Sequence, residues 1–343
     1  MRDPRTLLQP LRALHAQVRD EIVSATERQD IRSLSAVDRE EPGDTIYAID
    51  VVGEEMVTRF ADALAREHSF VLVAEGLSGG RKAYERDGAA EWVIIVDPID
   101  GTRGLMYQKR SAWVLTGVAR NRGPDTSLQD IVLAVQTEIS LVKQHLSDQM
   151  WAVRGGGLQA QRHNRLTGES QSIALRPSTA ASIAHGYASI ARFFPGARDE
   201  LAAVDEAIIR GALGAPPPGK THCFEDQYAS TGGQLYELLA GHDRFVADLR
   251  PLMRPLLSGR GYPPSLTCHP YDICTALIAQ EGGVIVTDPH GQPLDAPLNV
   301  EAEVAWAGYA NAAIQAQIEP LLQQELRARR LIDNPAEAGL HDE

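Results

Sequence analysis

Two aspartates lie three residues apart in the string D-P-I-D-G-T, which directly follows the apolar run WVIIV. The proline of this string has a fixed backbone dihedral φ and the glycine permits a sharp bend, so Asp97 and Asp100 can point into one pocket at the end of a strand. The same turn can expose the backbone carbonyl of Ile99. Oxygen ligands of this kind suit Mg²⁺, which usually keeps several waters and pairs with substrate phosphates.

Three more acids stand at the ends of apolar or helical segments. Asp50 closes the run YAID, Glu75 closes FVLVAE, and Asp272 opens the helical segment of HPYDICTALIAQEGG. If these acids converge with Asp97 and Asp100, their combined negative charge is very costly unless cations neutralise it. Two or three Mg²⁺ ions would do so, and such ions create a site for phosphoryl transfer.

Each acid taken alone also has an ordinary structural explanation. Aspartate is common in turns and at the N-terminal caps of helices, and an acid at a strand end can simply face solvent. Thr102 lies where a helix could begin, so its hydroxyl could contact a metal-bound water or only cap that helix. The order of these acids along the chain, taken together, favours the metal site.

Two segments, WVIIVDPIDGTRG and HPYDICTALIAQEGGVIVTDPHGQPLD, resemble the inositol monophosphatase family of Mg²⁺-dependent, lithium-sensitive phosphatases. Its superfamily includes fructose-1,6-bisphosphatase and the 3′-phosphonucleotide phosphatases. A weaker likeness runs through YAIDVVGEEMV, FVLVAEG and WAVRGGGLQAQRHN, so the resemblance spans roughly residues 5–310. It implies hydrolysis of a small phosphate monoester, and it implies inhibition by lithium.

The resemblance also implies two metal-binding sets. Glu75, Asp97 and the carbonyl of Ile99 would bind one ion, and Asp97, Asp100 and Asp272 would bind a second. Two or three Mg²⁺ ions are therefore the expected cofactors, which act by producing a nucleophile and by stabilising the leaving oxygen.

For catalysis, the resemblance implies that Asp50 and Thr102, together with Glu75, orient and activate the attacking water. The backbone amides of Gly101 and Thr102 would contact the phosphate at the start of a helix, where anions are favoured. The reaction would be an in-line displacement at phosphorus. The remaining candidates for substrate contacts are Arg103, Gly233 and Asp248.

Three departures from the family pattern bear on these expectations. Gly76 stands where the family usually has a second acid after the Glu75 position, which bears on the number of metal ions. Tyr271 replaces the tryptophan that precedes the last aspartate, and we expect it to alter packing and not ligation. Residues 250–268 are longer than in small members of the family and could form a different substrate wall.

Substrate identity stays open among three hypotheses. The first is a sugar or polyol phosphate monoester. The second is a bisphosphate such as fructose 1,6-bisphosphate or a 3′-phosphoadenylate, and the third is a non-catalytic protein that binds metal or phosphate. The second is motivated by basic residues that could bind another phosphate or a carboxylate, or could form a solvated face: Arg81, Lys82, Arg103, Lys109 and Arg110.

Composition narrows the class of protein. The chain of 343 residues has 33 basic and 46 acidic residues and a net charge of −13, which argues against a nucleic-acid scaffold. The three cysteines (Cys223, Cys268 and Cys274) have no C-x-x-C spacing, so neither a closed disulfide set nor a structural zinc site is expected.

The charged first residues and the lack of a long apolar run predict a soluble cytoplasmic protein without membrane partners. We expect a homodimer, the commonest symmetric assembly.

The elements that must position the acids follow from hydrophobic spacing. Helices are predicted over 7–22, 54–65, 231–241 and 271–280, and a surface helix from residue 320. Strands are predicted over 44–50, 70–74, 92–96, 112–119, 131–138, 149–153, 245–249 and 284–287. Turns or loops are predicted at EPGD, LSGGRKAYERDG, RGGGLQAQRHN, 211–220 and 250–265.

The resemblance implies an α/β fold in which helix and sheet layers alternate, an αβαβα sandwich of the sugar phosphatase type. We expect an N-terminal half, 1–157, that carries Asp50, Glu75 and the D-P-I-D-G-T string, and a C-terminal half, 158–343, that carries Asp272. The metal site would lie between these halves.

Overall fold

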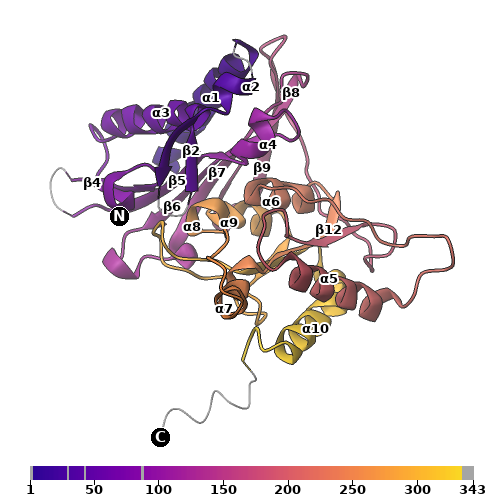
Figure 1. The fold of residues 1–343 in the computed structure, drawn as a ribbon. Coiled ribbons are helices and arrows are strands. Elements are labelled where there is room, and N and C mark those ends of the chain that lie inside the picture. Colours follow the sequence, from indigo (N-terminus) through magenta and orange to yellow (C-terminus); the bar gives the residue numbers. More distant parts are fainter. Residues whose placement is uncertain (1–2, 29–30, 42–43, 86–88, 334–343) are drawn as a thin grey trace, which may run out of the picture.

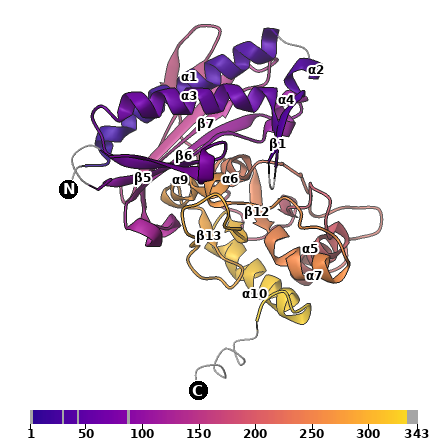
Figure 2. The same ribbon diagram turned by 60° about the vertical axis from the view of Figure 1, so that its left-hand side comes forward.

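A computed structural model of the chain describes residues 3–28, 31–41, 44–85 and 89–333. Its elements stack in five layers: helices, a large sheet, helices, a smaller sheet and helices (Figures 1 and 2). This arrangement confirms the predicted layered α/β sandwich. Over these described residues, no helix combines the length and the apolar character that a membrane crossing requires.

The large sheet and its outer helices form the first two layers. Helices α1 (Arg5–Arg28) and α3 (Ala48–Leu64) cover one face of the sheet, with the short α2 (Ile31–Leu34) beside them. The sheet has eight strands in the order β10 (Ser170–Ser172), β9 (Leu158–Asn164), β8 (Leu146–Val153), β7 (Ile131–Ile139), β6 (Ala112–Arg120), β5 (Trp92–Asp100), β3 (Phe70–Ala74) and β4 (Arg81–Tyr84). Only the β3–β5 pair is parallel.

The middle layer lies between the two sheets and consists of α6 (Thr231–Leu239), α8 (Pro270–Ile273) and α9 (Ala276–Glu281). The smaller sheet has the order β11 (Tyr187–Ile190), β12 (Asp243–Asp248), β14 (Trp306–Tyr309) and β13 (Ile285–Thr287). One hydrophobic cluster joins the layers, because Leu115 of the large sheet, Leu238 of α6 and Trp306 of the smaller sheet all belong to it. The outermost layer contains α5 (Arg198–Leu213) and α10 (Ala312–Ala328).

The remaining elements are short. A hairpin of β1 (Val37–Glu41) and β2 (Asp44–Tyr47) precedes α3, while α4 (Thr102–Met106) follows β5 and α7 (Arg254–Gly259) lies in the segment predicted as a long loop. Turns of 3₁₀ helix occur at Ser78–Gly80, Gly123–Asp125, Leu128–Asp130 and Arg250–Met253.

Most predicted helices and strands are present, but several local predictions were wrong, including the long loop over 250–265, which contains α7. The run 44–50 is a strand only to Tyr47, where α3 begins, so Asp50 lies in the first helical turn. The glycine-rich segments predicted as loops or turns contain β4 and β9, because sheet neighbours supply hydrogen bonds that no local pattern shows. The helix expected over 271–280 is interrupted between α8 and α9.

The large sheet extends past the expected boundary at residue 157, since β9 and β10 still belong to it. The glycine and proline of the predicted EPGD turn, residues 42 and 43, lie outside the described residues, as does the end of the chain from residue 334. All three cysteines are free thiols.

Candidate active site

Strand β5 carries both aspartates of the D-P-I-D-G-T string. In its antiparallel pairing with β6, Asp97 lies opposite Leu115 and Asp100 opposite Trp113, so β5 has one residue more than β6 over this stretch. Residues three apart in a regular strand point to opposite faces, and a bulge of one residue returns them to the same face. Both carboxylates therefore line one pocket, together with Glu75, which directly follows the parallel strand β3.

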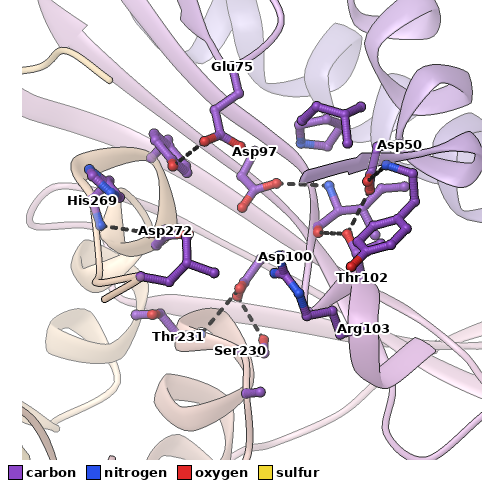
Figure 3. Close-up of a pocket in the computed structure, with 18 of the residues that line it drawn as sticks. Asp50, Glu75, Asp97, Asp100, Thr102, Arg103, Ser230, Thr231, His269 and Asp272 are labelled. Atoms are coloured by element: carbon purple, nitrogen blue, oxygen red, sulfur yellow. Dashed lines mark hydrogen bonds between the residues drawn. The ribbon is translucent and has the colours of Figure 1, made fainter. Parts of the chain in front are cut away.

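Three carboxylates converge in this pocket (Figure 3). One oxygen from each of Asp97, Asp100 and Asp272 lies within 4.8 Å of the others. Burial raises the pKa of all three carboxyls, to about 6 for Asp100, and neighbouring carboxylates add to the increase for Asp97 and Asp272. A divalent cation would favour the ionised forms, and oxygen donors of this kind fit Mg²⁺.

The start of α6 holds Asp100 in place. The Ser230 hydroxyl and the Gly232 amide donate to one carboxylate oxygen at 2.7 and 2.6 Å, and the Thr231 amide donates to the other at 3.3 Å. A side chain at residue 232 would displace its neighbours, because a Cβ atom there would lie 2.6 Å from the Leu115 side chain and 3.0 Å from Asp100 Oδ2. Sequence reasoning did not find these contacts; a polar Ser-Thr-Gly-Gly string at a helix start was the only available signal.

Glu75 and Asp272 are each oriented by a residue of the segment 269–271. The His269 amide donates to Asp272 Oδ2 at 2.6 Å, which caps α8. The Tyr271 hydroxyl donates to Glu75 Oε1, so Tyr271 contacts a predicted metal ligand directly and does more than fill space. Its ring stacks on that of His269 with centroids 5.3 Å apart.

Asp50 and Thr102 contact each other directly in the pocket. The Thr102 hydroxyl lies 2.7 Å from Asp50 Oδ1 and 2.9 Å from the Ile99 carbonyl oxygen, so its proton has two acceptors within reach. The other oxygen of Asp50 accepts the Tyr47 amide at 2.9 Å and thereby caps α3. Helix capping thus fixes the carboxylate while leaving Oδ1 directed at Thr102.

Glu54 of α3 fills the space beside Gly76, where the family usually has an acid. A Cβ atom on residue 76 would lie 2.6 Å from Glu54 Oε1, and Gly76 has a positive φ of 76°. Arg39 donates to both oxygens of Glu54, at 2.9 and 2.8 Å. Glu54 lines the candidate pocket, so a carboxylate from a different element occupies this region. Sequence reasoning missed Glu54: because residues 44–50 were predicted as a strand, Asp50 and Glu54 were not placed four residues apart on one helix.

A second part of the pocket lining consists of cationic and aromatic side chains from both halves of the chain. Arg103 of α4 lies with its guanidinium carbon 5.7 Å from the Tyr47 ring centroid and 5.1 Å from that of Phe194. Arg250 lies 4.3 Å from the Phe193 ring centroid, and all of these residues line the pocket. Phe193 and Phe194 were not among the predicted site residues.

Two predicted substrate contacts lie outside the pocket lining. Asp248 is fully buried, and both of its oxygens accept from Arg250, including the Nε–Oδ1 bond at 2.8 Å. Gly233 lies inside the first turn of α6, where its amide donates to the Ser230 hydroxyl at 2.9 Å. Asp248 therefore positions Arg250, and Gly233 helps to position Ser230.

The predicted basic patch is divided by the fold. Arg103 lines the pocket, whereas Lys82 pairs with Asp62 at 3.3 Å and Arg110 pairs with Asp226 outside the lining. Of the five residues of the patch, all of which the structure describes, Arg103 is the one that lines the pocket.

No family model matches the chain, and no curated protein matches it. Two solved structures match the chain over nearly its whole length. The extragenic suppressor protein SuhB from Bartonella henselae is 14% identical with a TM-score of 0.63, covering 93% of this chain and 99% of its own. The holo form of Leishmania major fructose-1,6-bisphosphatase is 13% identical with a TM-score of 0.67, covering 95% of this chain and 96% of its own. The chain shares its fold with these proteins over nearly its whole length.

Proposed function

We propose that this chain is an Mg²⁺-dependent phosphatase that hydrolyses small phosphate monoesters. The observation that carries the proposal is the convergence of Asp97, Asp100 and Asp272 beside the Asp50–Thr102 pair. The fold supports it, because one protein that shares this fold is named a fructose-1,6-bisphosphatase.

In this proposal the chain's carboxylates hold the cations and its hydroxyl groups direct a proton. Glu75, Asp97 and the Ile99 carbonyl would bind one ion, and Asp97, Asp100 and Asp272 another. Bound Mg²⁺ supplies Lewis-acid activation of water and stabilises the leaving oxygen. The bulge in β5 and the hydrogen bonds from α6 pre-orient the ligands, so little reorganisation is needed when substrate arrives.

The Asp50–Thr102 pair would orient the attacking water. When the Thr102 hydroxyl donates to Asp50 Oδ1, its oxygen can accept a proton from a water in the pocket. The Asp50 carboxylate then receives the proton through the Thr102 hydroxyl, which makes the water more nucleophilic.

Phosphate release from a panel of monoesters, with Mg²⁺ added, tests the proposal. We expect turnover of at least one sugar or polyol phosphate by the wild type and loss of turnover when EDTA removes the metal. Release no faster than that of an Asp97→Asn variant, on every substrate, would overturn it.

A Thr102→Val variant is expected to lower kcat by about 100-fold, because valine keeps the shape but cannot relay a proton to Asp50. Mg²⁺ affinity should remain near that of the wild type, since the hydroxyl is not among the proposed ligands. Steady-state kinetics and calorimetric titration measure the two effects. Thr26→Val is the matched control, because the Thr26 hydroxyl likewise donates to a backbone carbonyl, at 2.7 Å, but Thr26 lies outside the pocket lining. Equal kcat in Thr102→Val and Thr26→Val would contradict the proposed relay.

A Tyr271→Phe variant is expected to weaken Mg²⁺ binding by about tenfold, because the hydroxyl that orients Glu75 is lost. Calorimetric titration with Mg²⁺ measures this directly, without turnover. Tyr236→Phe is the matched control, since the Tyr236 hydroxyl donates to the buried Asp148 at 2.8 Å, outside the pocket lining. The positioning role is wrong if both variants bind Mg²⁺ as the wild type does.

A further inference from the structure

A second cavity lies where the C-terminal half of α1 meets the ends of three strands of the large sheet. Helix α1 lies across one face of that sheet (Figure 2). The cavity has a volume of about 150 Å³, and its lining contains two arginines, two acids and three serines. Among the residues that the structure describes, none lines both this cavity and the active-site pocket. The cavity is therefore separate from the proposed phosphoryl chemistry.

Two of the serines are buried without a hydrogen-bond partner. Ser140 directly follows β7 and Ser147 lies at the start of β8, and each is 3% exposed. Within the described part of the chain, neither hydroxyl donates or accepts a hydrogen bond, and the same is true of the half-buried Ser24 of α1. Buried hydroxyls are normally hydrogen-bonded, because their desolvation is otherwise uncompensated. The three hydroxyls are therefore available to a molecule in the cavity.

Arg19 of α1 brings a buried positive charge to the same cavity. Its side chain is 7% exposed, and its Nε and Nη2 atoms both contact one oxygen of Asp20 at 2.8 Å. A guanidinium has further N–H groups, and no acceptor for Nη1 occurs among the described residues. Asp20 is 62% exposed, so water screens its charge. Arg19 can therefore donate to an additional acceptor.

The other charged residues form the outer part of the lining. Arg165, which directly follows β9, donates to the backbone carbonyls of Gln144 and Val142 and to the Glu27 carboxylate, so its three nitrogen atoms are already occupied. Glu27 is 42% exposed. The two acids thus lie toward solvent, whereas the buried side chains of the lining can donate hydrogen bonds and carry a positive charge.

We infer that this cavity binds a small tetrahedral oxyanion, phosphate or sulfate, either free or as the phosphate group of a larger molecule. The available donors come from α1, from the end of β7 and from the start of β8, so they approach the cavity from different elements. A tetrahedral oxyanion has acceptor oxygens in several directions, and an arginine forms strong charge-assisted hydrogen bonds with it. The inference does not depend on the proposed function, because the two linings are separate.

Calorimetric titration of the full chain with inorganic phosphate tests the inference. EDTA keeps the acid cluster of the active site free of Mg²⁺, so that cluster repels the anion, and sodium chloride holds the ionic strength constant. We expect sulfate to bind as phosphate does and acetate to bind more weakly. Methyl phosphate distinguishes the two sources, since tighter binding than that of phosphate would indicate the phosphate group of a larger molecule. The inference is wrong if none of these three tetrahedral anions binds.

Variants assign the binding to this cavity. Arg19→Met is expected to weaken phosphate binding by about 10- to 100-fold, the effect of losing hydrogen bonds from a charged group. Ser140→Ala and Ser147→Ala should each weaken it by about 3- to 10-fold. Arg12→Met is the matched control, because it removes the same charge from the same helix but lies outside the lining, and it should bind as the wild type does. Equal binding by all of these variants would overturn the inference.

The serine variants keep the test decisive if Arg19→Met folds poorly. Their hydroxyls have no partner among the described residues, so each alanine variant should unfold at or above the wild-type melting temperature when no anion is present. Phosphate should raise the melting temperature of the wild type and of Arg12→Met, and it should raise that of Ser140→Ala and Ser147→Ala by less. An equal increase in all four proteins would contradict the assignment of the anion to this cavity.

Discussion

An Asp97→Asn variant is expected to lose phosphate release by at least about 10³-fold, which corresponds to about 4 kcal/mol of transition-state stabilisation. Asp97 is the one carboxylate that the proposed function assigns to both metal ions. Asparagine keeps its size, but it replaces a charged oxygen with an amide and so weakens both sites. The measurement is initial-rate phosphate release at saturating Mg²⁺, with calorimetric titration of the metal.

The same variant is expected to be more stable than the wild type when metal is absent, by about 1–2 kcal/mol. Burial, and then the charges of Asp100, Asp272 and Glu75, raise the pKa of Asp97 well above its ordinary value. Removing this charge relieves both effects. The Mg²⁺-dependent increase in melting temperature, which the wild type should show, is expected to shrink in the variant because less metal binds.

The stability difference should depend on pH. A carboxyl whose pKa is higher in the folded state than in the unfolded state stabilises the folded protein. This stabilisation is complete at a pH below the pKa of the unfolded state, and it is lost as the pH rises through the pKa of the folded state. For Asp100 this window runs from 3.8 to about 6. The contribution of this cluster to the stability of the metal-free wild type therefore falls with rising pH, and Mg²⁺ should remove much of that fall. Urea unfolding at several pH values, with and without Mg²⁺, measures it.

Asp148→Asn is the matched control. Asp148 is 1% exposed, but its carboxylate accepts from Arg162 at 2.7 and 2.8 Å, so its charge is compensated. Asp148→Asn should lower the free energy of unfolding with or without Mg²⁺. In the metal-free protein this change is opposite in sign to that expected for Asp97→Asn. A metal-free Asp97→Asn protein that unfolds more easily than the wild type would contradict the explanation from buried charge.

Arg250→Met is expected to destabilise the protein by about 3–5 kcal/mol, because it leaves the Asp248 carboxylate buried without its cation. Asp248 is fully buried and Arg250 is 5% exposed, so water cannot replace the lost partner. Adding Asp248→Asn to this variant should recover a large part of the loss, since the uncompensated charge is then removed. Equilibrium unfolding of the wild type, both single variants and the double variant gives the coupling free energy.

Arg254→Met is the control for this cycle. Arg254 pairs with Glu303 at 2.7 Å, but its side chain is 58% exposed, and exposed ion pairs contribute less than about 1 kcal/mol. A cost for Arg250→Met no larger than that for Arg254→Met would show that the Asp248–Arg250 pair does not stabilise the fold.

The strands next to the candidate site were predictable because their sequences are continuous apolar runs. Strand β3 has the predicted bounds, and β5 begins at the predicted Trp92, since residues buried on both faces leave no polar alternation. Asp50 was harder to place. YAID resembles a strand, but the hydrogen bond from the Tyr47 amide to Asp50 starts a helix, and the packing of α3 on the sheet continues it.

The acids at the ends of elements could be recognised from the amino-acid sequence, because proline, glycine and apolar runs act on a few neighbouring residues. Which of these acids meet, and what each one contacts, depends on the packing of the whole chain. A bulge against β6 turns Asp97 and Asp100 to one face of the sheet, and the start of α6 donates three hydrogen bonds to Asp100. Arg250 donates to both carboxylate oxygens of Asp248. Such contacts join residues far apart in the chain, and their geometry depends on how the layers pack, which no local pattern encodes.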